Sequence, residues 1–408
     1  MTYLIGYNSI VVARARRLAT PGGSEVNSIK YIGIYIHIPF CASKCAYCNF
    51  YSLAGRDMLM PAYQAAIIKH ISDHAAQLDE YLTNTVYFGG GTPGYFGAGR
   101  LAEILGALKS HGRMLPDAEI TAEVNPGGIA GDELAILKRA GLNRLSVGVQ
   151  CADDRILASL GRIHTFADAE KTIKNARESG FNNISIDIIY GLPSQDMKGW
   201  TETVEKALAL ESEHISCYGL KLEEGTRLYG LKDSPLIPGD DDQADMYLYA
   251  IEALERSGYR QYEISNFARE GFESKHNLKY WSLKDYLGFG PGAHSYIGRK
   301  RFNYPADIDK YIESVSSGLN AVEHAEEISD DENAAEYLML RLRTTHGISE
   351  DEYSTMTGMS FDRILTLLRK YEANGWAVST KGRWSFTPRG FLISNALIGE
   401  LLYPKTFL

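Results

Sequence analysis

The sequence contains only five cysteines among 408 residues, and it has neither a long apolar run nor an excess of basic residues. An odd number of cysteines, three of them within eight residues, does not suit a framework of disulfides, so we expect a reducing compartment and a cytoplasmic protein. Without a run of about 18 apolar residues, no transmembrane helix is expected. The net charge of −9 argues against nucleic acid as a main partner.

The first thirty residues differ from the rest in charge. They include Arg14, Arg16 and Arg17 and no acidic residue before Glu25. An arginine-rich, acid-poor start is typical of a transit peptide. A flexible tail, or a start codon placed too far upstream, explains the same pattern. Because no other feature indicates an organelle, we predict a flexible extension over residues 1–30.

Short β-rich runs alternate with stretches that fit helices. This alternation predicts an α/β protein with a parallel sheet, and six such units predict a curved or partly closed barrel. The runs are nearly continuous in apolar residues, as expected of parallel strands that are buried on both faces. The expected strands are residues 32–38, 85–88, 119–124, 144–149, 184–189 and 214–220. The expected helices are residues 61–82, 100–111, 132–140, 166–179 and 197–210.

Beyond this core the composition changes twice. We expect residues 31–240 to form the core barrel, and residues 241–325, which are dense in aromatic residues and glycine, to extend it. The sequence "GWAVSTKGRWSFTPRGF" then predicts a short hairpin after several helices, so we expect a mostly helical, winged-helix-like domain over residues 326–408. Its lack of basic excess favours a packing role over nucleic-acid binding. The expected helices of this domain are residues 330–345, 350–357 and 361–374.

Three cysteines follow the first expected strand in "YIHIPFCASKCAYCNFYS", at Cys41, Cys45 and Cys48. A structural zinc ion takes four ligands, and His37 lies in the strand before the cysteines, where it does not complete the set. Iron–sulfur clusters are held by cysteine thiolates, four for a closed [4Fe–4S] cluster. Three thiolates leave one iron with an open position, so the pattern favours a [4Fe–4S] cluster that binds a small molecule directly.

Polar residues lie where the expected strands end. They are "GGGTP" (89–93), "EVNP" (123–126), Gln150, Asp187 and "YG" (218–219). In βα barrels the carboxyl ends of the strands carry the active site. Five polar strand ends in succession therefore predict one shared site.

With its CxxxCxxC run, the chain resembles the radical S-adenosylmethionine (SAM) superfamily, in the branch of the anaerobic coproporphyrinogen III oxidases. The resemblance implies a radical SAM partial (β/α)6 barrel and a C-terminal domain of the HemN type. It also implies that SAM chelates the fourth iron and that an electron donor, such as flavodoxin or ferredoxin, reduces the cluster. Glycines 89–91 let a backbone approach the ligand closely, and carboxylates and an arginine suit a zwitterionic nucleoside. The SAM-contacting positions of the branch match Tyr35, Tyr47, Gly90, Gly91, Thr92, Glu123, Gln150, Arg162 and Asp187.

Two families within this branch resemble the chain. The oxygen-independent coproporphyrinogen III oxidases, which carry out an oxidative decarboxylation in haem biosynthesis, have the pattern CxxxCxxCxC. The haem chaperone family HemW has CxxxCxxCNF and an HNxxYW motif. This chain has Asn49 and Phe50 after Cys48, and it has "HNLKYW" at residues 276–281. The resemblance to the HemW family is therefore the stronger one.

The HNLKYW segment supplies the haem-binding candidates His276, Asn277, Tyr280 and Trp281. Imidazole is a common axial ligand of haem iron, and the two aromatic residues offer flat apolar surface for a macrocycle. A capped helix start with an aromatic pair in the core explains the same spacing. Elsewhere, we expect His294 to be a satisfied core residue, and neither Cys151 nor Cys217 to be a ligand, since free cysteine is usually a small buried hydrophobe.

These observations predict a haem chaperone that carries a [4Fe–4S] cluster and SAM and hands haem to an unidentified acceptor protein. No catalytic residue is assigned. Two alternatives remain open: oxidative decarboxylation of coproporphyrinogen III, and a radical SAM enzyme that acts on haem itself.

Overall fold

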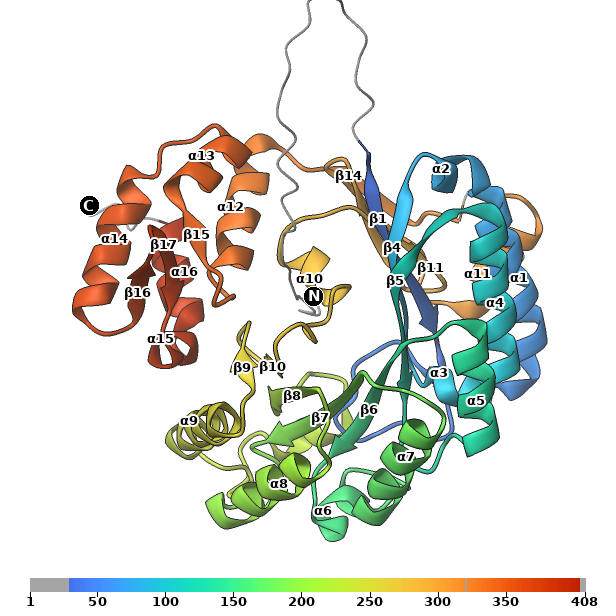
Figure 1. Cartoon of the computed structure of the whole chain (residues 1–408), viewed down its shortest axis with the longest axis horizontal. Helices are drawn as coiled ribbons and strands as arrows, with labels where there is room; N and C mark the ends of the chain where they lie inside the picture. The colour runs from blue at the N-terminus through green and yellow to red at the C-terminus, as the bar shows by residue number, and fades with distance from the viewer. Residues whose placement is uncertain (1–28, 320, 404–408) are drawn as a thin grey trace, which may run out of the picture.

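The computed structural model describes residues 29–319 and 321–403, so the prediction for the N-terminal extension lies almost entirely outside the described residues. One large, curved sheet of twelve strands organises the fold (Figure 1). Its strand order is β14-β13-β12-β11-β1-β4-β5-β6-β7-β8-β10-β9. No helix in the described ranges is both long and apolar enough to cross a membrane.

Six neighbouring strands of this sheet run parallel, as the sequence predicts. They are β1 (Tyr31–Ile38), β4 (Leu82–Gly90), β5 (Arg113–Val124), β6 (Arg144–Gln150), β7 (Ile184–Tyr190) and β8 (His214–Gly219). The helices between them are α1 (Met60–Asp73), α2 (Ala75–Asp79), α3 (Pro93–Phe96), α4 (Ala98–His111), α5 (Gly131–Ala140), α6 (Asp154–Ser159), α7 (Phe166–Glu178) and α8 (Met197–Ala209), with η1 (Asp57–Leu59) before α1. The single helix predicted over 61–82 is two helices, because His74 leaves helical geometry between α1 and α2.

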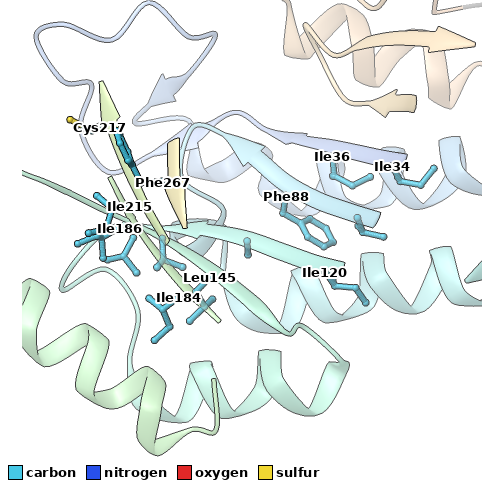
Figure 2. Close-up of a cluster of buried hydrophobic side chains, with 14 of the residues drawn as sticks. Ile34, Ile36, Phe88, Ile120, Leu145, Ile184, Ile186, Ile215, Cys217 and Phe267 are labelled. Atoms are coloured by element: carbon cyan, nitrogen blue, oxygen red, sulfur yellow. The ribbon is translucent and has the colours of Figure 1, made fainter. Parts of the chain in front are cut away.

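The two faces of the parallel strands differ in chemistry, which corrects the expectation that both are apolar. Alternate residues of a strand point to opposite faces. One set is apolar and packs in a continuous core; in Figure 2 it includes Ile34, Ile36, Phe88, Ile120, Leu145, Ile184, Ile186, Ile215, Cys217 and Phe267. The other set, here called the inner face, includes Tyr35, Tyr87, Thr121, Glu123, Arg144 and Asp187. The parallel strands therefore enclose polar side chains.

Further strands extend both edges of the parallel sheet. Strand β11 (Tyr286–Phe289) runs parallel to β1, and β12 (His294–Ile297), β13 (Lys300–Asn303) and β14 (His324–Glu327) continue antiparallel. Beside β8 lie β10 (Asn266–Ala268) and β9 (Arg260–Gln261), both antiparallel. The remaining elements of this region are η2 (Arg227–Leu231), α9 (Asp240–Arg256), α10 (Asn277–Tyr280) and α11 (Ile308–Ser316). The short helix α10, which carries the HNLKYW segment, lies on the concave side of the sheet (Figure 1).

The C-terminal residues form helices followed by a hairpin, in the predicted order. A three-stranded sheet of order β15-β17-β16 packs with these helices. The elements are α12 (Asp330–Arg341), β15 (Ile348–Ser349), α13 (Glu350–Thr357), α14 (Asp362–Ala373), β16 (Ala377–Thr380), β17 (Arg383–Phe386), α15 (Pro388–Leu392) and α16 (Ser394–Leu402). The domain boundaries near residues 30, 240 and 325 stay predictions.

Candidate functional site

The three cysteines lie in a loop at the carboxyl ends of the parallel strands, here called the barrel mouth. Cys41 ends the short strand β2 (Phe40–Cys41), which pairs with β3 (Leu53–Ala54). The loop is fixed at Ala46, whose N–H donates to Leu160 O (2.8 Å) and whose C=O accepts from Leu228 N (2.9 Å). Backbone hydrogen bonds to two distant segments therefore hold the loop in place before any cofactor binds.

The chemistry of the cysteines fits a cluster better than a single ion. Burial raises the pKa of the Cys41 and Cys48 thiols, so each thiol keeps its proton until a metal displaces it. Within the described part of the chain, no three His, Cys, Asp or Glu side chains are grouped as they would be around one metal ion. Zinc needs four donors about one point, whereas a [4Fe–4S] cluster takes its thiolates on separate irons.

A continuous series of polar contacts joins the cysteine loop to the strand ends. Cys41 Sγ lies 3.4 Å from Thr92 Oγ1, which accepts a hydrogen bond from Asn125 Nδ2 (3.1 Å). Arg162 then donates to Asn125 Oδ1 (2.8 Å) and to the hydroxyl of Tyr47 (2.6 Å). Four predicted site residues are thus brought together, and Asn125 is a fifth that the sequence analysis did not single out, although it lies within the quoted "EVNP".

Arg162 still has capacity for a ligand. Its Nε is a buried atom with no hydrogen-bond partner in the described structure, while its two terminal nitrogens bind Asn125 and Tyr47. An unsatisfied buried donor costs free energy unless a partner completes it. A ligand carboxylate at this point would satisfy the guanidinium, so the site fits the carboxylate of an amino-acid-like group.

Glu123 and Asp187 provide two buried carboxyl groups at the same site. Glu123 accepts from the hydroxyl of Tyr87 (2.9 Å) and from Gly90 N (3.2 Å), and burial raises its pKa to about 7. Burial also raises the pKa of Asp187, against the opposing effects of Ser216 and Arg144. A cationic or hydroxyl-bearing ligand would stabilise the ionised forms of both groups.

The glycines at the end of β4 are required by the protein itself. A Cβ on Gly90 would come within 2.6 Å of His37 Cε1, and Gly90 has φ of +113°. A Cβ on Gly91 would come within 2.8 Å of Phe40 O. The missing side chains therefore admit the strand β1 and the start of the cysteine loop, and only the backbone of these glycines is left to meet a ligand.

Gln150 has a strained backbone conformation, with φ of +68°, although it is buried and not glycine. Such strain concentrates at functional sites. Its Nε2 would lie 2.7 Å from a Cβ on Gly148, and Asn125 Oδ1 would lie 3.3 Å from the same position. Gln150 thus reaches the contact series around Arg162.

Tyr35 lies on the inner face. Its hydroxyl forms a hydrogen bond with His37 Nδ1 (3.1 Å), and its ring stacks on that of Tyr87, with 6.3 Å between the ring centroids.

The haem-binding candidate His276 is buried and fully engaged. Its Nδ1 lies 2.9 Å from Thr85 Oγ1, and its Nε2 lies 2.9 Å from the hydroxyl of Tyr280. Burial lowers its pKa to about 3, with Lys279 and Arg144 as further causes. Ligation of iron by this imidazole therefore requires at least one of the two hydrogen bonds to break.

The other residues of the HNLKYW segment are also packed in the protein. Trp281 packs with Leu278 and Leu340, and Tyr280 meets Tyr286 edge to face at 4.6 Å. Asn277 begins α10, with its N–H 3.4 Å from Ser274 Oγ. These contacts are those of a helix start with core aromatic residues, the alternative interpretation of the motif.

His294 corrects an expectation. We expected a satisfied core residue, but His294 is exposed on β12. The alternation of the strand explains the error, because Ser295 on the opposite face of β12 is fully buried and takes the core position instead. Cys151 and Cys217, in contrast, are both buried.

The environment of His276 predicts a structural role. His276→Ala should lower the free energy of unfolding by about 1–3 kcal/mol at neutral pH, because it leaves two buried hydroxyls unpaired. The unfolded state protonates this imidazole more readily than the folded state does. The stability lost in the variant should therefore shrink as the pH falls below about 6.5 towards the folded-state pKa of about 3.

Urea unfolding at several pH values measures both effects, with the exposed His324→Ala as the matched control. Equal midpoints for wild type and His276→Ala would contradict the packing described above.

The chain is similar to known proteins in both sequence and fold. The model of the radical SAM superfamily matches residues 35–207, and the model of the HemN C-terminal domain matches residues 328–393. A solved structure titled "Coproporphyrinogen III oxidase (HemN) from Escherichia coli is a Radical SAM enzyme" has a TM-score of 0.81. It is 22% identical and covers 94% of this chain and 91% of that chain, which shows the shared fold.

Two relatives are similar along most of their length. The heme chaperone HemW of Bacillus subtilis (strain 168) is 35% identical over 372 residues, which cover 90% of this chain and 98% of that protein. The heme chaperone HemW of Escherichia coli (strain K12) is 31% identical over 378 residues, which cover 90% and 97%. The chain therefore belongs to the radical SAM superfamily and, within it, to the HemW family.

Proposed function

We propose that this protein binds haem and transfers it to an acceptor protein, and that it carries a [4Fe–4S] cluster on Cys41, Cys45 and Cys48 with SAM beside it. The observation that supports this most is the similarity to proteins named heme chaperone over nine-tenths of the chain. The cofactors follow from membership of the radical SAM superfamily.

The sequence after Cys48 supports the chaperone over the oxidase. The oxidase pattern has a fourth cysteine at the position of Phe50, and this chain has an aromatic side chain there, 40% exposed. The structural likeness to coproporphyrinogen III oxidase concerns the fold, which many different activities share. The oxidase activity and a radical reaction on haem remain the rival functions to test.

The residues at the barrel mouth have distinct roles in this proposal. Arg162 pairs with the carboxylate of SAM, and Glu123, Gln150 and Asp187 bind its ammonium or hydroxyl groups. Tyr35 and Tyr47 line the ligand, and residues 90–92 contribute backbone and the Thr92 hydroxyl. When bound, the cluster supplies one electron to SAM, and the protein positions both.

The partners are proposed on the same basis. An electron donor such as flavodoxin or ferredoxin reduces the cluster, and an unidentified acceptor protein receives haem in the cytoplasm. Phe50 and Lys44, both exposed beside the cysteines, belong to the surface nearest to the cluster, which such a donor must approach.

The cluster assignment predicts a clear division among the five cysteines. Replacing Cys41, Cys45 or Cys48 with Ala should abolish the broad iron–sulfur absorption after anaerobic reconstitution, because two thiolates hold a [4Fe–4S] cluster poorly. Cys151→Ala and Cys217→Ala are the controls and should retain the absorption, since Cys151 is buried against Thr203 in the apolar cluster that includes Ala46 and Cys217 belongs to the main core. Loss of the cluster in Cys151→Ala to the same degree as in Cys45→Ala would contradict the three-ligand assignment.

The raised pKa of Glu123 predicts that SAM binding depends on pH. The carboxyl group has a pKa of about 7 in the free protein, and the positively charged ligand prefers its ionised form. Affinity should therefore fall as the pH drops below 7, by about tenfold per unit once the carboxyl is protonated. Glu123→Gln should bind SAM more weakly at pH 8 and should lack this fall.

Equilibrium binding of SAM to the reconstituted protein between pH 6 and pH 8 measures the difference, with cluster absorption as a check on integrity. The Gln variant is the matched control, because it keeps any pH dependence that belongs to SAM itself or to Asp187, so the difference between the two profiles belongs to Glu123. If SAM affinity depends on pH in the same way in wild type and in Glu123→Gln, Glu123 does not bind SAM.

Haem titration tests the function itself. The reconstituted protein should bind haem with a shifted Soret band, with or without SAM, and should release the haem chemically unchanged. It should make no protoporphyrinogen from coproporphyrinogen III, even with SAM and a strong reductant.

Turnover of coproporphyrinogen III at about 1 per second or faster, an ordinary rate for an enzyme, would contradict the chaperone function and support the oxidase function. Consumption of haem with SAM would instead favour the reaction on haem.

A further inference from the structure

Arg144 is a buried cation without a partner of its own. It is the first residue of β6 and lies on the inner face, and only 2% of its surface is exposed. Its Nε has no hydrogen-bond partner, and in the described part of the chain no hydrogen bond or ion pair involves this guanidinium. A buried charge without a hydrogen bond costs several kcal/mol by general estimates. Glu123 and Asp187 offset part of this cost through the field, so a direct partner for the guanidinium would stabilise the site further.

The nearby carboxyl groups already have other partners. Glu119 accepts from the backbone N–H groups of Lys275 (3.0 Å) and His276 (2.9 Å). Glu123 accepts from Tyr87 and Gly90, and Ser146 donates to Asp187 at 3.5 Å. The field of Arg144 acts on Glu123 and Asp187 without a direct contact, and the proposed function assigns both to SAM.

Lys279 is a second buried basic residue. Burial lowers the pKa of its ammonium group to about 8, against the opposing field of Asp285, so the group is still mainly charged at neutral pH. The residue is 7% exposed, and no hydrogen bond or ion pair among the described residues involves its ammonium group. Its aliphatic stem occupies the space that a side chain on residue 33 would need, since a Cβ on Gly33 would lie 2.6 Å from Lys279 Cδ and 2.9 Å from Thr85 Oγ1. The fold thus provides a fitted slot for this lysine on the concave side of the sheet.

His276 lies between Lys279 and Arg144 and contacts residues beside each of them. Its Nδ1 hydrogen-bonds Thr85, which adjoins the stem of Lys279. Its ring stacks on Tyr87 at 5.3 Å, and Tyr87 pairs in register with Thr121, which pairs with Arg144. Thr121 Oγ1 is itself a buried atom without a hydrogen-bond partner. Buried polar atoms without hydrogen-bond partners and the aromatic rings of Tyr87 and Tyr280 therefore lie around the HNLKYW segment.

We propose that Arg144 and Lys279 form a binding site for two carboxylates on the concave side of the sheet, and that its ligands are the two propionates of haem. The inference rests on the proposed function. A guanidinium binds a carboxylate through two parallel hydrogen bonds, and an ammonium binds one as a point charge. Tyr87 and Tyr280, which contact His276, supply aromatic surface for the macrocycle beside the two cations.

Because both cations are buried, α10 must move before a ligand can reach them. The propionates reach Arg144 only when the segment of residues 274–282, which carries Lys279, moves away from the sheet. Lys279 leaves its slot beside Gly33 in the same movement and binds the second propionate from the side of α10. That movement breaks the hydrogen bond between His276 and Thr85 and frees Nδ1 of the imidazole for iron. Propionate binding and exposure of the histidine are thus two results of the same displacement.

Haem and its dimethyl ester test the site, because the ester keeps the iron and the macrocycle but has no carboxylate charge. Wild-type reconstituted protein should bind haem about tenfold to a hundredfold more tightly than the ester, the effect of hydrogen bonds to charged groups. Arg144→Met and Lys279→Met should each weaken haem binding by about tenfold or more, and should change binding of the ester far less. The exposed Arg139→Met and Lys171→Met are matched controls.

Stability and SAM affinity distinguish a binding role from a structural one. Since an unpaired buried cation destabilises the folded state, Arg144→Met should unfold at the same or a higher urea concentration than wild type. SAM affinity should not change in Lys279→Met. In Arg144→Met it should match that of wild type once the pH is high enough to ionise Glu123 and Asp187 in both proteins, because the field of Arg144 lowers the pKa of these two groups.

Equal affinity of wild type for haem and its ester would overturn the proposal, as would full haem affinity in both variants. A loss of SAM affinity in Arg144→Met that persists at the pH where Glu123 and Asp187 are ionised would also overturn it, because the guanidinium would then serve the carboxylate of SAM. If wild type binds neither haem nor the ester, the proposed function fails, which is a different result from equal binding of both.

Discussion

The division of the parallel strands into an apolar and a polar face is the constraint on which the rest of the structure depends. Apolar residues such as Ile34, Ile120 and Ile186 join the core, so their neighbours along each strand must point to the concave side. Those neighbours are tyrosines, carboxylic acids and arginines, and buried polar groups need partners. The interior of the barrel is therefore a place where a polar ligand is energetically useful, and both proposed ligand sites lie there.

The barrel mouth shows how the fold prepares for a reactive cofactor. The cysteine loop is fixed by its own backbone at Ala46, and the contacts from Cys41 through Thr92 and Asn125 to Arg162 tie it to the ends of β4 and β5 and to the segment between α6 and α7. A site that is held in place in this way loses little entropy when its ligand binds. The strained backbone of Gln150 is consistent with the same principle, because the surrounding structure compensates for the strain.

The sequence predicted the parallel strands well, because each one is a short β-rich run bounded by turn residues. It also predicted that the strand ends share a site, since parallel strands carry their carboxyl ends to one edge. Asn125 was missed because its role depends on Thr92 and Arg162, which lie 33 and 37 residues away. Arg144 was missed for a different reason: apolar residues dominate "RLSVGV", and the significance of its first residue appears only when its neighbours prove to be engaged elsewhere.

The HNLKYW segment illustrates why a motif and a conformation can point in different directions. The motif resembles that of a haem-binding family, yet His276 is hydrogen-bonded at both nitrogens and Trp281 is packed against Leu340. Under the proposed site for two carboxylates, both descriptions hold, because residues 274–282 would adopt two arrangements, of which the described one is closed. In the closed arrangement Thr85 and Tyr280 satisfy the imidazole, while Arg144 and Lys279 have no direct hydrogen bond or ion pair among the described residues. Under that proposal, a dicarboxylate ligand would supply those direct partners. In this proposal, haem would differ from its uncharged analogues in supplying those partners, and the charge of its propionates would be the physical reason for the segment to open.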